Sequence, residues 1–196
     1  TPAERAVLTR AKFIYSTIAH LRRIVGIQGV LAEAHTRGAR LFIDVEAESF
    51  RSAEEDWWAF SAADFLSFNE ESLDKFRGTK SAGPAIADLL SASGAEIVTT
   101  LGKGGCEVVS PAGRWRVAGL RVATVDPLGA GDTFNATYLF GRSQGWSIED
   151  SARFANLAAA RSTTMTGPRS GRATVGTVME FLEHLKRTGA AAACPA

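Results

Sequence analysis

The chain has 196 residues, of which 45% are hydrophobic and 22% charged, a composition typical of a globular domain with one core. Its 22 basic and 21 acidic residues give a formal net charge of +1, which provides no field that would attract nucleic acid or an anionic membrane surface. No run approaches the roughly 18 apolar residues of a membrane-spanning helix, and no signal peptide opens the chain. We therefore expect a cytoplasmic protein with a small-molecule partner, no nucleic-acid partner and no membrane attachment.

Neither the cysteines nor the histidines form a pattern that would hold a metal. Cys106 and Cys194 are far apart in the sequence, and the three histidines show no ligand spacing. The chain begins at Thr1 rather than at an initiator Met, and its first apolar segment follows almost at once. We expect the chain to be part of a longer polypeptide.

Strand-like and helix-like segments alternate through the first half of the chain. Helices are expected at 21–37, which Gly38 then ends, and at 69–76 and 85–93. Such alternation predicts right-handed crossovers and a mostly parallel sheet covered by helices on its faces. The expected strands, which are short runs rich in apolar residues, are 12–16, 40–45, 65–68 and 96–100.

The last third of the chain departs from this alternation. The segment Pro111-Ala112-Gly113 is typical of a hairpin turn between strands at 106–110 and 114–117. Residues 1–188 are expected to form one domain, and 189–196 a disordered tail. Three helices are expected after the hairpin, at 130–144, 148–163 and 175–187.

One segment combines a glycine-rich turn with the start of an apolar helix: Val125-Asp126-Pro127-Leu128-Gly129-Ala130-Gly131-Asp132-Thr133-Phe134-Asn135. The unpaired amides of a helix's first turn, with the positive end of the helix dipole, bind phosphate or a developing negative charge. Asp132 has two interpretations: it caps the helix, or it is a general base that takes a proton from a hydroxyl attacking a phosphoryl group. The Gly-Ala-Gly before it favours the second.

The run from Asp126 to Phe134 resembles the C-terminal signature of the ribokinase, or PfkB, family of carbohydrate kinases. The resemblance implies that Asp132 is the catalytic base, and that the amides of Gly129, Ala130 and Gly131 form an anion hole for the transferred phosphoryl group. It also implies a ribokinase-like three-layer αβα sandwich with a mostly parallel central sheet. The family's N-terminal part and β lid do not precede Thr1, so we expect them to be missing from this chain.

A second glycine-rich segment, Thr100-Leu101-Gly102-Lys103-Gly104-Gly105, follows the strand expected at 96–100. It is neither a Walker A loop nor a dinucleotide-binding fingerprint, and by itself it is typical of a turn. It resembles the family's Thr-x-Gly-x-x-Gly loop beneath the nucleotide phosphates. That resemblance implies that Thr100, Gly102 and Gly105 contact the nucleotide.

Asn69-Glu70-Glu71-Ser72 resembles the family's Asn-x-x-Glu motif, which positions nucleotide phosphate and water-bound magnesium. Asn69 fits the motif, but Ser72 stands where the motif has Glu, so a magnesium role would fall to a neighbouring acid such as Glu71. Without the family, Asn69 is an ordinary helix N-cap and the acidic residues suit a positive helix end. Both interpretations remain open.

Three further positions carry expectations from the resemblance. The family position matching Asn156 faces the adenine, that matching Gly167 borders the nucleotide, and that matching Asp126 serves a monovalent cation such as K⁺. From the residues alone, Asn156 lies on an amphipathic helix, Gly167 is part of a stop signal, and Asp126 forms a turn before Pro127.

The most specific expectation is an ATP- and Mg²⁺-dependent sugar kinase, with a homodimer made through the missing lid. The stretch 126–151 and the segment Asp44-Val45-Glu46 resemble ketohexokinases, which favours a ketose such as fructose as substrate. A non-catalytic nucleotide-binding domain is the first alternative, because the motif Glu and the sugar-binding half are missing. An NAD-dependent oxidoreductase is the second, and the poor dinucleotide fingerprint speaks against it.

Overall fold

The computed structural model describes residues 1–188, which divide into two units. The first unit comprises residues 1–99 and 109–114, and the second comprises 100–108 and the chain from Trp115 onward. The tail expected at 189–196 lies outside the described residues. No helix among residues 1–188 is both long and apolar enough to cross a bilayer.

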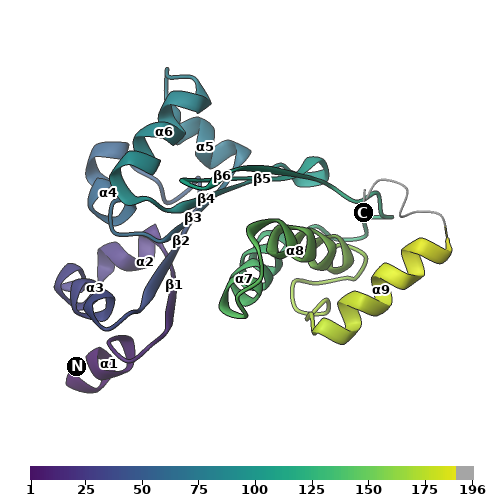
Figure 1. The fold of residues 1–196 in the computed structure, drawn as a ribbon, viewed down its shortest axis with the longest axis horizontal. Helices are drawn as coiled ribbons and strands as arrows, with labels where there is room; N and C mark the ends of the chain where they lie inside the picture. Colours follow the sequence, from purple (N-terminus) through teal and green to yellow (C-terminus); the bar gives the residue numbers. More distant parts are fainter. Residues whose placement is uncertain (189–196) are drawn as a thin grey trace. The chain divides into compact units, whose positions relative to one another are not determined.

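The strands form one mixed six-stranded sheet in the order β1-β2-β3-β4-β5-β6 (Figure 1). β1 runs parallel to β2, and β2 parallel to β3, as the alternation of strands and helices predicts. The first four strands are β1 (Phe13–Thr17), β2 (Arg40–Val45), β3 (Phe65–Asn69) and β4 (Glu96–Thr100).

Helices of the first unit cover one face of these strands with an apolar core. Side chains alternate along each strand, so that Leu41 and Ile43 point into this core whereas Phe42 points to the opposite face. On that opposite face, Phe42 stacks between Tyr15 and Phe65. The helices of the first unit are α1 (Pro2–Leu8), α2 (Ile18–Arg23), α3 (Ile27–Thr36), α4 (Ala53–Phe60), α5 (Glu70–Arg77) and α6 (Ala82–Ser93).

The prediction of a single helix at 21–37 is wrong, because the chain breaks between α2 and α3. Gly26 adopts φ +74° at this break, and Val25 is fully exposed beside it. The helix α1 was not expected from the sequence. It begins with a capping box in which the Thr1 hydroxyl accepts from the amide of Glu4, with Pro2 in the first turn.

Two α-helices of the second unit form a helical hairpin, and the last helix of the described chain packs on that hairpin. Gly141 allows the hairpin helices to approach, since a Cβ there would lie 2.7 Å from the hydroxyl oxygen of Ser151. Leu157 packs with Val178 and Leu185 of the last helix. The hairpin strands β5 (Gly105–Ser110) and β6 (Gly113–Ala118) each have residues in both units. The helices of the second unit are the short 3-10 helix η1 (Gly102–Gly104), α7 (Ala130–Ser143), α8 (Ile148–Ser162) and α9 (Val175–Arg187).

Candidate active site

The turn that opens α7 requires a glycine at Gly129 for two reasons. Gly129 is the N-cap and adopts φ +79° and ψ 5°, which L side chains rarely adopt. A Cβ on Gly129 would also lie only 3.0 Å from the Cβ and the carbonyl oxygen of Pro168. The backbone amides of this turn are therefore fixed in place by a close contact with the segment that follows α8.

Amides of this turn are available to an anion. The amide of Ala130 donates to the carbonyl of Pro127 at 3.2 Å, whereas those of Gly131 and Asp132 have no acceptor among residues 1–188. A Cβ on Gly131 would meet nothing within 4 Å, so the space beside these amides is open. The amide of Gly131 is thus free, whereas that of Ala130 is already engaged, and the anion hole expected from Gly129, Ala130 and Gly131 stays a prediction.

Asp132 is the third residue of α7, and its side chain is exposed. Its carboxylate forms neither a hydrogen bond nor an ion pair with any residue of the described chain. The interpretation of Asp132 as a capping residue is therefore not supported, because a capping carboxylate would accept from a backbone amide. An exposed, unpartnered carboxylate beside free amides is suited to accept a proton from an incoming hydroxyl.

Asp126 ties the turn before α7 to the turn after α8. One of its carboxylate oxygens accepts from the amide of Leu128 at 2.9 Å, and the other accepts from the amide of Gly167 at 2.8 Å. These two amides hold the pKa of Asp126 below its usual range. In addition, the amides of Val125 and Asp126 donate to the carbonyl of Thr163, at 2.8 and 3.0 Å. Nothing in the local sequence pattern predicts these contacts between the two turns.

No cluster of three or more His, Cys, Asp or Glu suited to a metal occurs within residues 1–188. Both carboxylate oxygens of Asp126 already accept backbone hydrogen bonds. The role of Asp126 toward a monovalent cation stays a prediction.

Gly105, the first residue of β5, lies where backbones pass close together. A Cβ on Gly105, which adopts φ +95°, would lie 2.0 Å from the carbonyl oxygen of Val117. The amide of Leu101 donates to the carbonyl of Gly105 at 2.8 Å, and Gly102 adopts φ +51°. Packing alone therefore accounts for Gly105, whereas contact of Thr100, Gly102 and Gly105 with a nucleotide stays a prediction.

Asn156 connects α8 to the end of β6. Its side chain is 8% exposed, and its amide nitrogen donates to the carbonyls of Val117 and Ala118 at 3.2 and 3.3 Å. Burial raises the pKa of the Cys106 thiol to about 12, and a hydrogen bond with Asn156 lowers it by a smaller amount. Asn156 thus has a structural role, and its contact with adenine stays a prediction.

In the first unit, Asn69 is the N-cap of α5, as the sequence indicates. Its side-chain oxygen accepts from the amide of Ser72 at 2.7 Å, while the fully buried Ser72 hydroxyl accepts from the amide of Asn69 at 3.0 Å. Ser72 therefore takes part in a capping box. Glu71 is exposed and lies 3.6 Å from the Lys75 ammonium, so its magnesium role also stays a prediction.

The structure thus assembles the expected residues in three groups. The first group meets at the start of α7 and comprises Asp126, Gly129, Ala130, Gly131, Asp132 and Gly167. The second group runs from the end of β4 to the start of β5, with Thr100, Gly102 and Gly105, and includes Asn156, which contacts β6. The third group, Asn69 and Glu71, belongs to the first unit.

Comparison with known proteins shows the family to which the chain belongs. Residues 30–174 match the family described as pfkB family carbohydrate kinase, so the chain belongs to that family. Its fold is the ribokinase-like α/β fold of the family's solved structures. With 35% identity over 97 residues, the chain is similar to a ribokinase of Bacillus subtilis, which it covers for 33% of that protein's length and 50% of its own.

Two solved structures show the same fold. Ribokinase II from E. coli, in complex with ATP and Mg²⁺, aligns with a TM-score of 0.78 at 18% identity, over 92% of this chain and 61% of that one. The fructokinase of Xylella fastidiosa with bound ATP aligns with a TM-score of 0.79 at 20% identity, over 92% and 64%. The chain thus spans about a third of the length of the Bacillus subtilis ribokinase and about three fifths of these two structural neighbours.

Proposed function

We propose that the complete protein transfers the γ-phosphoryl group of ATP to a hydroxyl of a sugar. The observation that carries this proposal is the unpartnered carboxylate of Asp132 in the first turn of α7, beside free amides. Asp132 accepts the proton of the attacking hydroxyl, which makes the oxygen a better nucleophile. The amides of Gly131 and its neighbours then stabilise the charge that develops on the transferred group.

The donor groups present fit a nucleotide and a hydrated magnesium ion. In the second unit, the space beside the amide of Gly131 is open to a phosphate. In the first unit, the exposed carboxylate of Glu71 is of the type that binds Mg²⁺ through the ion's waters. When bound, Mg²⁺ neutralises charge on the phosphates. A monovalent cation near Asp126 and a homodimer formed through a lid segment belong to this proposal, and are tested by activity with and without K⁺ and by the mass of the complete protein.

The substrate that we propose is a ketohexose such as fructose. Support comes from the resemblance of 126–151 and of Asp44-Val45-Glu46 to ketohexokinases, while the similar proteins include both a ribokinase and a fructokinase. ADP release by the complete protein, measured with fructose, ribose and adenosine as acceptors, should be fastest with fructose. Faster release with ribose would refute the ketose assignment without refuting the kinase.

The role of Asp132 is tested with Asp132→Asn in the complete protein. We expect ATP affinity to stay nearly unchanged and turnover to fall by at least about 100-fold, as for a lost general base. Asp150→Asn is the matched control, since Asp150 is also the third residue of its helix, and its carboxylate interacts with the Ser147 hydroxyl that caps α8. Near-normal turnover of Asp132→Asn would refute the assignment.

A non-catalytic nucleotide-binding protein is the second candidate. Ser72 favours it, because a buried serine replaces the acid of the family's magnesium motif. Calorimetry that shows ATP binding by the complete protein, without sugar-dependent ADP release, would support this candidate over the kinase.

A further inference from the structure

A tight turn directly follows the clamp made by Asp126. In the segment Gly167-Pro168-Arg169-Ser170, the amide of Ser170 donates to the carbonyl of Gly167 at 3.3 Å. Gly167 itself is held by Asp126 at 2.8 Å. On the other side, Gly171 is buried, and a Cβ there would lie 2.7 Å from the Cα of Ser162. Both ends of the turn are thus fixed.

Arg169 stands at the tip of this turn, next to the start of α7. The neighbouring Pro168 lies against Gly129, with its Cα 3.1 Å from the position that a Cβ on Gly129 would take. Consecutive Cα atoms are about 3.8 Å apart, so the backbone of Arg169 is one residue from the anion-hole turn. The long arginine side chain starts close enough to reach a group bound at these amides.

The charge of Arg169 is not neutralised by the protein. Its side chain is exposed and has neither a hydrogen bond nor an ion pair within the described part of the chain. Arg161, by contrast, donates to the carbonyl of Gly171 at 3.3 Å. The backbone of Arg169 lies one residue from the close contact of Pro168 with Gly129, so its unneutralised charge adds positive potential near the start of α7. The planar donors of a guanidinium match phosphate oxygens.

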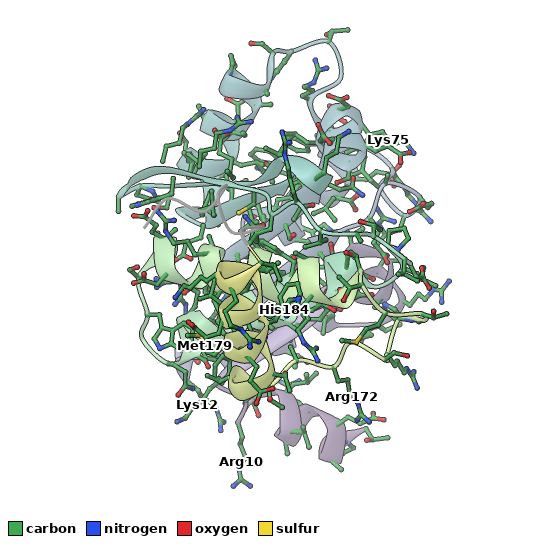
Figure 2. All side chains as sticks on the ribbon, turned by 90° about the vertical axis from the view of Figure 1, so that its right-hand side faces the viewer. Arg10, Lys12, Lys75, Arg172, Met179 and His184 are labelled. Carbon is green, nitrogen blue, oxygen red and sulfur yellow. The ribbon has the colours of Figure 1, made fainter. Side chains whose placement is uncertain are left out.

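We propose that Arg169 is a phosphate-binding residue, whose guanidinium contacts the phosphates of the nucleotide at the start of α7. This inference rests on the proposed function and adds a side-chain cation to a site otherwise built from backbone amides. Arg172, three residues further on, is also exposed and lies on the segment that leads into α9 (Figure 2). It is the neighbouring alternative that the experiment must separate from Arg169.

The test compares ATP and adenosine binding by the complete protein and its variants. In Arg169→Ala we expect ATP to bind about 10-fold to 100-fold more weakly, the usual effect of losing a charged hydrogen bond, while adenosine binding is unchanged. Arg169→Lys should restore part of the ATP affinity. Arg187→Ala is the matched control, because it removes the same charge at the far end of α9, about 20 Å along the helix axis from its start.

The outcomes separate this inference from the proposed function. If the unaltered protein does not bind ATP, both are refuted. If it binds ATP, and Arg169→Ala binds it as tightly as Arg187→Ala does, only the role of Arg169 is refuted. The same conclusion follows if Arg172→Ala alone weakens ATP binding. Equal weakening of ATP and adenosine binding in Arg169→Ala would show a general disturbance of the site, and would also overturn the inference.

Discussion

Two adjacent glycines, Gly104 at the end of η1 and Gly105 at the start of β5, should respond very differently to substitution by alanine. Gly105 adopts φ +95° and ψ −131°, a conformation almost restricted to glycine, which costs another residue about 1–3 kcal/mol. Its added Cβ would also lie 2.0 Å from the carbonyl oxygen of Val117 and 2.5 Å from the amide of Gly119, and relieving such overpacking costs about 1–3 kcal/mol more. Gly105→Ala should therefore lower the free energy of unfolding by about 2–6 kcal/mol.

Gly104→Ala is the control for this prediction. Gly104 has a negative φ, and its added Cβ would approach only the Cβ of Leu101, at 3.3 Å. We expect a change within about 1 kcal/mol. Urea unfolding of the complete protein, followed by circular dichroism, measures both variants. Equal midpoints for Gly105→Ala and Gly104→Ala would refute the explanation of Gly105 by close backbone packing.

The remaining predictions concern Asp126, before the start of α7, and Cys106 with Asn156, near the end of β6. Backbone amides depress the pKa of Asp126, so its stabilising contribution is present above the unfolded carboxyl pKa of about 3.9 and is lost as the pH falls through the lower folded value. The urea midpoints of the unaltered protein and Asp126→Asn should therefore differ at pH 7 and converge in acid, and a difference independent of pH would contradict this. In a Cys194→Ser background, buried Cys106 should resist a thiol reagent at pH 8, because its pKa is about 12. Asn156→Ala should cost about 1–3 kcal/mol of stability, because it removes the hydrogen bonds to the carbonyls of Val117 and Ala118, and an unchanged urea midpoint would count against these bonds.

Much of the fold could be predicted because its strands are short apolar runs bounded by turn residues. The expected strands at 40–45 and 96–100 coincide with β2 and β4, and the start of α7 at Ala130 follows from the glycine-rich turn before it. The break between α2 and α3 was missed, because one glycine within an apolar periodic pattern does not by itself end a helix. The signal for α1 was present in Thr1, Pro2 and Glu4, which form a typical helix start.

The site was predictable only where its residues are neighbours in sequence. Gly129 and Asp132 lie in one motif, which a sequence shows directly. Asp126 and Gly167, or Gly129 and Pro168, are about forty residues apart, and nothing in the local pattern shows that they meet. For Asn156, the helical pattern predicts a buried face but not the carbonyls to which its amide donates.

The bond between Asp126 and Gly167 has a consequence for how the protein folds. It joins residues 41 positions apart, and it closes a loop that contains the helical hairpin of α7 and α8. Closing this loop costs little conformational entropy once both helices have formed, because the hairpin already brings the ends of the loop together. The amides at the start of α7 should therefore acquire their final geometry as the hairpin docks. Substitutions that slow this docking should delay the recovery of the proposed nucleotide binding during refolding.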